Sequence, residues 1–252
     1  MRKTSIAVTA LLAAAAIAWA GGEPWKTKSM DQWTDKDITE ILQTSPWAKA
    51  NVPTQGAGTR PDGMTPATGS TGIAGSKSDT SHVAAGMDPQ QNGASEKQDS
   101  AAANSATYSI FWWSSRTIRA ASMRKAVLKG TMTEADAEKT VANVPDDYML
   151  LVQGTNLQIF QHRGEQAFEK AAYLQLKKTK QKIYPTKVAF LKSPDESTVT
   201  GVVFYFPKKG AGDEPTISPD EKEVDFYLQM GDAKLYTYFD PRKMVDSKGE
   251  DL

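Results

Sequence analysis

The sequence predicts an α+β fold in which helices accompany a mainly antiparallel sheet. Three observations lead to this prediction: helix signals gather early in residues 107–252, four strand-like runs follow one another at the end, and short turn motifs join those runs. Helices followed by consecutive strands are typical of antiparallel α+β domains, whereas parallel sheets alternate strand and helix. A short helix and a disordered tether are expected to precede this domain.

Residues 1–20 have the layout of a secretory signal peptide. A positive start, an apolar run at residues 6–17 and small residues at Ala18 and Ala20 follow the order that signal peptidase reads. The alternative is an uncleaved membrane anchor, but about fifteen residues at roughly 1.5 Å each fall short of a hydrocarbon core of roughly 30 Å. We therefore expect cleavage after Ala20 and a periplasmic or secreted protein.

The charge balance argues against two classes of partner. Residues 1–20 hold two basic residues and no acid, so their removal leaves 28 basic and 30 acidic side chains, a net charge near −2. Nucleic-acid binding needs a basic footprint that displaces counterions, and a membrane-surface role needs a polybasic patch. We therefore expect no nucleic acid and no membrane insertion after signal cleavage. The expected partner is a protein or an envelope component.

The rarity of nucleophiles and soft ligands limits the chemistry. The chain has no cysteine, which excludes disulfides, thiol nucleophiles and thiolate metal sites. A Ser-His-Asp triad or a histidine-based metal site must use His82 or His162, the two histidines of the chain. His82 lies in a tract that would not orient it. His162 and Glu165 flank Gly164, which favours a polar loop before a helix, so we predict no cofactor and no metal.

Residues 21–48 are expected to form a docking segment around one helix. Thr34 is a good N-cap with Asp37 three residues later, and Trp33 and Ile38 occupy the staple positions. A helix of about ten residues is not stable alone in water, so it must dock on the C-terminal domain or on a partner. The expected anchors are Trp25, Trp33 and Trp47.

Residues 49–106 are expected to be a disordered linker. The tract is rich in Gly, Ser, Thr, Ala and Pro, and no aromatic residue occurs between Ala48 and Tyr108. Such a segment cannot bury enough apolar area to offset the entropy of ordering its backbone. The expected division of the chain is therefore a signal peptide, a docking segment, a linker and a domain at residues 107–252.

The elements of that domain follow from caps, turns and alternation. Ser114 or Ser115 is the expected cap of its first helix, with Gly130 just past the end. Gly231-Asp232 between two alternating runs predicts a tight hairpin. The expected order is strand 108–113, helix 115–129, a helix from 133, strand 147–152, helix 165–178, and strands 186–191, 198–206, 223–230 and 234–239.

Aromatic and basic residues supply the candidates for recognition. Trp112 and Trp113 are adjacent on a predicted strand and therefore face opposite sides of the sheet. Both can be core, or one can meet the docking segment or a ligand. Arg116 and Arg119 follow at helical spacing and could bind an acidic group, although solvated surface arginines are commoner. The candidate contact residues are Trp33, Trp47, Trp112, Trp113, Arg116 and Arg119.

Three short motifs carry a resemblance to other proteins. They are Trp33 with Ser45-Pro46-Trp47-Ala48, Trp112-Trp113 with Ile118-Arg119-Ala120, and Phe239-Asp240-Pro241-Arg242-Lys243-Met244. Together they resemble a group of uncharacterised exported proteins of acidobacterial type. The resemblance covers the docking segment and much of the domain, but not the linker. It implies export and assigns no activity and no catalytic residue.

The sequence favours a non-enzymatic protein- or envelope-interaction module. Acid pairs such as Asp146-Asp147 and Asp195-Glu196 lie in predicted turns, where solvated charge explains them better than the spaced carboxylates of a glycosidase. The alternatives are an envelope hydrolase with Asp or Glu chemistry and a tryptophan-based glycan-binding module. A pocket that gathers His162 with two carboxylates would favour the hydrolase, and a flat row of exposed tryptophans would favour glycan binding.

Overall fold

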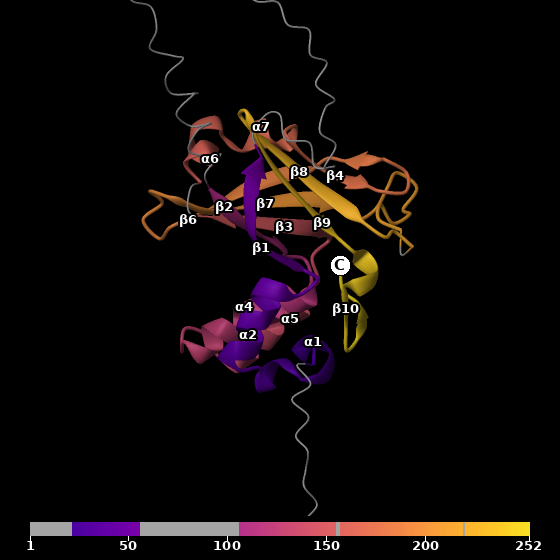
Figure 1. Ribbon diagram of the computed structural model, residues 1–252. Helices are drawn as coiled ribbons and strands as arrows, with labels where there is room; N and C mark the ends of the chain where they lie inside the picture. The colour runs from indigo at the N-terminus through magenta and orange to yellow at the C-terminus, as the bar shows by residue number, and fades with distance from the viewer. Residues whose placement is uncertain (1–21, 56–105, 155–156, 219) are drawn as a thin grey trace, which may run out of the picture.

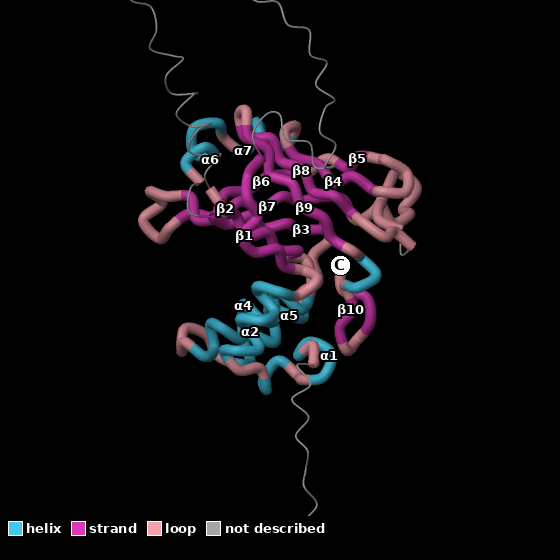
Figure 2. Tube along the Cα trace, viewed as in Figure 1, coloured by secondary structure: helices cyan, strands magenta, loops and turns pink. Residues whose placement is uncertain are grey.

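The computed structural model describes residues 22–55, 106–154, 157–218 and 220–252. The predicted signal peptide, most of the predicted linker and His82 lie outside these ranges. A large curled antiparallel sheet and a group of helices beneath it make up the fold (Figures 1 and 2), which confirms the α+β prediction. In the described ranges no helix is long and apolar enough to cross a membrane.

One sheet of the described chain contains nine strands in the order β5-β4-β8-β9-β1-β2-β3-β7-β6, and its neighbouring strands pair antiparallel. A small hairpin pairs β10 with β11. The strands are β1 (Ala48–Gln55), β2 (Thr107–Trp112), β3 (Asp147–Gly154), β4 (Ala172–Leu176), β5 (Lys182–Ile183), β6 (Lys187–Lys192), β7 (Val199–Pro207), β8 (Val224–Met230), β9 (Ala233–Phe239), β10 (Val245–Asp246) and β11 (Gly249–Glu250).

The helices gather mainly at one end of the sheet, where α2, α4 and α5 lie together below it in Figure 1. A second pair, α6 and α7, lies at the other end. The helices are α1 (Pro24–Thr27), η1 (Met30–Gln32), α2 (Asp35–Thr44), α4 (Arg116–Leu128), α5 (Glu134–Ala142), α6 (Gln158–Arg163), α7 (Glu165–Glu169) and η2 (Pro241–Lys243).

The core lies between the two halves of the curled sheet. β8 alternates between buried residues such as Phe226 and partly exposed ones such as Tyr227, the period expected of a strand with one covered face. The Phe226 ring centroid lies 5.6 Å from that of Phe204 on β7, although four strands separate β7 from β8 in the sheet. This contact shows that the curl brings distant strands face to face.

The N-terminal helix α2 begins where its capping signals predict. The Thr34 hydroxyl accepts the Asp37 N–H at 3.3 Å, and the Asp37 carboxylate accepts the Thr34 N–H at 2.9 Å. Trp33 and Ile38 are both buried, as a hydrophobic staple requires. The helix packs against α4 and leads directly into β1, so residues 22–55 fold together with the C-terminal part of the chain.

The predicted start of the linker is wrong, because residues 49–55 belong to β1. This strand pairs with β2 on one side and with β9 on the other. Its sequence is polar and carries little apolar signal, so its order comes from hydrogen bonds to two strands that are remote in sequence. The first residues of the predicted linker therefore form a strand in the same sheet as the strands of the predicted domain.

The predicted helix at residues 165–178 is wrong beyond Glu169. There α7 ends, and β4 follows between β5 and β8. Ala172 and Leu174 are buried while Tyr173 between them is partly exposed, an alternation that suits a strand. Pairing with β8 therefore outweighs the local helix propensity of this stretch.

Candidate functional site

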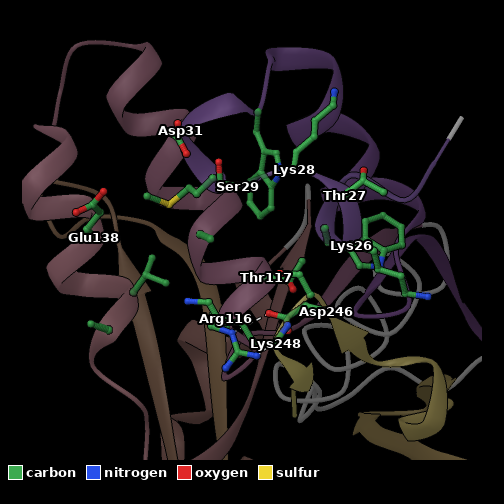
Figure 3. Close-up of a pocket in the computed structure, with 17 residues that line it drawn as sticks. Lys26, Thr27, Lys28, Ser29, Asp31, Arg116, Thr117, Glu138, Asp246 and Lys248 are labelled. Atoms are coloured by element: carbon green, nitrogen blue, oxygen red, sulfur yellow. Dashed lines mark hydrogen bonds and ion pairs between the residues drawn. The ribbon is translucent and has the colours of Figure 1, made fainter. Parts of the chain in front are cut away.

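A cavity of about 530 Å³ lies where the N-terminal turns meet α4, α5 and the β10–β11 hairpin (Figure 3). Its volume falls within the range of small-ligand pockets, roughly 300–1,000 Å³. Charged side chains of both signs stand among the lining residues, and the remainder is largely apolar. The apolar lining comprises Trp25, Met30, Trp33, Ala120, Val141 and Ala142.

Two tryptophans form one wall of the cavity, and intramolecular contacts fix both. Trp25 follows Pro24 at the first turn of α1, and its ring packs edge-on against Trp47 with centroids 5.7 Å apart. Trp33 ends η1, and its indole N–H donates to the Pro24 carbonyl at 3.3 Å. The wall is therefore built from local turns that rest on the fully buried Trp47.

An ion pair between Arg116 and Asp246 forms another side of the cavity. The guanidinium donates two hydrogen bonds of 2.7 Å to the Asp246 carboxylate, drawn as dashes in Figure 3. These hydrogen bonds are the main reason why the pKa of Arg116 lies above its ordinary value. The fork of Arg116 is thus already occupied and its charge is neutralised within the protein.

Residues near the C-terminus hold this side in place. The Asp251 carboxylate accepts the backbone N–H groups of Arg116 at 2.5 Å and Thr117 at 2.9 Å, so it caps the start of α4. The Asp251 carbonyl accepts the indole N–H of Trp47 at 2.6 Å. One residue therefore ties α4 to the start of β1.

Two polar atoms of the lining residues have no partner in the described part of the chain. They are the indole Nε1 of Trp25 and the hydroxyl Oγ1 of Thr117, whose side chains are 5% and 2% exposed. A buried polar atom without a hydrogen bond costs roughly 1–3 kcal/mol, and folded proteins usually satisfy such groups with protein, water or a ligand. Both atoms are buried, so they lie behind the surface of the cavity and are not open to a group bound inside it.

The structure brings Trp33 and Arg116 together in this cavity, and both were candidates from the sequence. Trp47 and Trp112 are fully buried instead. The Trp112 ring packs against Tyr148 and Phe239, with centroid distances of 5.6 and 5.2 Å. Trp47 therefore supports the cavity through Trp25, and Trp112 is a core residue.

The other two candidates also have intramolecular roles. Trp113 is partly buried and packs against the core. Arg119 is 8% exposed, and its Nη1 donates to the carbonyls of Thr140, Val141 and Asn143 at the end of α5. An arginine that satisfies the last carbonyls of a helix stabilises that end. Arg119 therefore positions α5 along the cavity and does not face a ligand.

Sequence reasoning missed the cavity residues that depend on tertiary contacts. Thr117 is an ordinary helix residue in the sequence, and nothing marks Asp246 as the partner of Arg116. The backbone N–H of Ser247 donates to the Trp25 carbonyl at 3.2 Å, which joins the two ends of the described chain at the cavity. One local signal for the β10–β11 hairpin is present in the sequence, namely Gly249. It adopts a φ of 111°, a region that glycine favours.

The features expected of the alternative functions are not formed by the described residues. No group of three His, Asp or Glu side chains among them could hold a metal ion. Glu165 accepts the backbone N–H of Phe190 at 3.0 Å, so it links α7 to β6, while His162 is exposed on α6. The tryptophans Trp25, Trp33, Trp47 and Trp112 are each at most 5% exposed and form no flat exposed row.

No family model, no curated protein and no solved structure matches this chain. The function must therefore be inferred from the geometry of the site.

Proposed function

We propose that this is an exported, non-enzymatic binding protein whose tryptophan-walled cavity receives an apolar side chain of a partner protein. The observation that carries the proposal is the cavity itself, with Trp25 and Trp33 in a largely apolar lining. Residues 1–20 have the layout of a signal peptide, which supports a periplasmic or secreted location. The contacts with the partner would then form outside the cytoplasm.

The composition of the cavity favours a protein partner over a small anion. Protein interfaces combine an aromatic, apolar centre with a polar rim, and tryptophan is prominent among their energetic anchors. Arg116, the cation best shaped for a carboxylate, is already held by Asp246.

Charged residues around the cavity give the partner an orientation. Asp31, Glu138 and Lys248 line it, and none of the three has an ion pair within the described ranges. Rim charges contribute mostly to specificity and association rate, since water screens them. A partner segment with one apolar side chain flanked by charges of both signs fits this arrangement.

The test is site-specific photo-crosslinking in the native host. A benzoylphenylalanine at Ser247, which is exposed and lines the cavity, should give a discrete protein adduct whose partner is then purified and titrated. Ala142→Trp should abolish that adduct and weaken binding of the purified partner at least tenfold, because the new ring fills the cavity. Thr140→Trp lies on the same helix but outside the lining, so it is the matched control.

Two results would reject the proposal. One is an adduct that persists unchanged in the Ala142→Trp protein, since the partner would then bind elsewhere. The other is equal weakening by Ala142→Trp and Thr140→Trp, since the cavity would then have no special part in binding.

A further inference from the structure

A second depression, of about 970 Å³, lies at one end of β4, β8 and β9. Its lining residues follow β4, precede β8, or belong to the end of β9 and to η2 and the residue before it. We call it the basic groove, because five basic and four acidic side chains line it, which leaves an excess of one positive charge. The lining residues that matter are Lys178, Glu221, Lys222, Glu223, Tyr238 and Asp240.

Two of the acids in the groove are already neutralised by cations. Glu223 pairs with Lys177 at 2.6 Å. Asp240 accepts two side-chain hydrogen bonds of 3.1 Å from Arg242, and these bonds are the main reason why its pKa lies below the ordinary value. The fork of Arg242 is therefore occupied, like that of Arg116 in the cavity.

A third acid, Glu221, is committed to the backbone. It is 2% exposed and accepts the N–H groups of Lys178 and Lys222, each at 3.2 Å. These bonds hold the two loops together and keep the carboxylate away from solvent. The side chains of Lys178 and Lys222 are exposed and have no carboxylate partner within the described ranges, and Asp220 is the unpaired acid beside them.

A third lysine borders the groove from β1. The ammonium of Lys49 lies 5.4 Å from the ring centroids of both Tyr238 and Phe239. Burial lowers the pKa of Lys49, and the nearby charge of Lys243 adds to that effect. The Asp240 carboxylate offsets part of this effect and pairs with Lys243 at 3.9 Å, so the positive charge beside Tyr238 is partly balanced within the protein.

Tyr238 offers a ring that its neighbours on the same face do not. Tyr173 and Tyr227 stack with centroids 4.8 Å apart, and Tyr227 packs on Tyr236 at 4.9 Å, so these rings largely cover one another. Tyr238 is 51% exposed and forms no ring contact with another aromatic side chain in the described part of the chain. Its exposed surface lies among the unpaired lysines.

We infer that the basic groove binds an acidic polysaccharide with one carboxylate on each sugar. The apolar face of a sugar ring would pack on Tyr238, and successive carboxylates would meet Lys178 and Lys222. Lysine ammonium groups act as point charges and can each meet a single carboxylate, and the arginine fork of the groove is taken by Asp240. The sugar ring that packs on Tyr238 distinguishes this ligand from a polyphosphate. This site is separate from the tryptophan cavity and does not depend on the function proposed for it.

The experiment is calorimetric titration of the mature chain, residues 21–252, with oligogalacturonate. We expect binding that weakens as salt is added, because the contacts are exposed ion pairs. The double variant Lys178→Gln/Lys222→Gln should weaken binding at least tenfold, and Tyr238→Ala should weaken it severalfold. Lys139→Gln, an exposed lysine on α5, is the matched control and should leave the affinity unchanged.

Three outcomes would overturn the inference. The first is no heat of binding for oligogalacturonate at millimolar concentration and low salt. The second is unchanged affinity in the double lysine variant. The third is equal or tighter binding of dextran or polyphosphate, because a neutral glycan needs no lysine and a polyphosphate carries no sugar ring for Tyr238.

Discussion

Replacement of Trp47 by alanine should remove a large share of the stability of the fold. The side chain is fully buried, packs against Trp25 and donates its indole N–H to the Asp251 carbonyl at 2.6 Å. Burial of about 150–250 Å² at about 25 cal/mol per Å² corresponds to roughly 4–6 kcal/mol. Alanine keeps part of this burial, and replacement of a buried tryptophan by alanine typically costs about 3–5 kcal/mol. Small domains are stable by only about 5–15 kcal/mol.

Urea unfolding of residues 21–252, followed by far-ultraviolet circular dichroism, measures this loss. Trp47→Phe keeps a ring but removes the N–H, so it should cost about 1–3 kcal/mol, the price of leaving the Asp251 carbonyl unpaired. Trp113→Ala is the control, because Trp113 is only partly buried. A loss below about 1 kcal/mol for Trp47→Ala, or one no larger than that of the control, would refute the reasoning.

Three further predictions test other parts of the structure. A specific protease site placed between Gln55 and Ala106 should yield two fragments that co-elute in size-exclusion chromatography, because β1 pairs with β2 and β9; separation without denaturant would contradict the shared sheet. Asp251→Ala should cost about 1–3 kcal/mol in urea unfolding, since the N–H groups of Arg116 and Thr117 lose their acceptor, and an unchanged midpoint would argue against that role. Burial raises the pKa of Asp225, so the folded state holds this proton more tightly than the unfolded chain and loses stability as pH rises between the two pKa values. Asp225→Asn should therefore stabilise the fold near about pH 7 and do so much less near about pH 3, and an equal effect at both pH values would count against a buried charge.

Helix starts could be predicted because their signals are local. Thr34, Ser115 and Thr133 each accept the N–H of the residue three positions later, as the sequence indicates. The hairpin at Gly231 is equally local, since that residue adopts a φ of 61° between two alternating strands. Caps and tight turns depend on residues that are close in sequence, so they can be predicted without knowledge of the tertiary fold.

Strands β1 and β4 could not be predicted, because their order depends on distant partners. Asn51 in β1 has a positive φ of 55°, and the register with β2 shifts between Lys49 and Val52. Nothing in the polar sequence of β1 reveals that irregularity or the pairing with β9. The residues of β4 have a strand-like alternation, but they also have good helix propensity, and only the open edge of β8 decides between the two.

The candidate site shows the same division between local and distant causes. Trp33 and Arg116 could be selected by residue type, but their proximity depends on residues 245–251. Three contacts from that stretch reach the cavity walls: Asp246 to Arg116, the Ser247 N–H to the Trp25 carbonyl, and Asp251 to the start of α4. Each wall taken alone is a short helix or turn that would not hold its position in water. The shape of the cavity therefore depends on the contacts that residues 245–251 make with the N-terminal turns and α4. Any change that releases these residues should disrupt both the tryptophan wall and the Arg116–Asp246 ion pair.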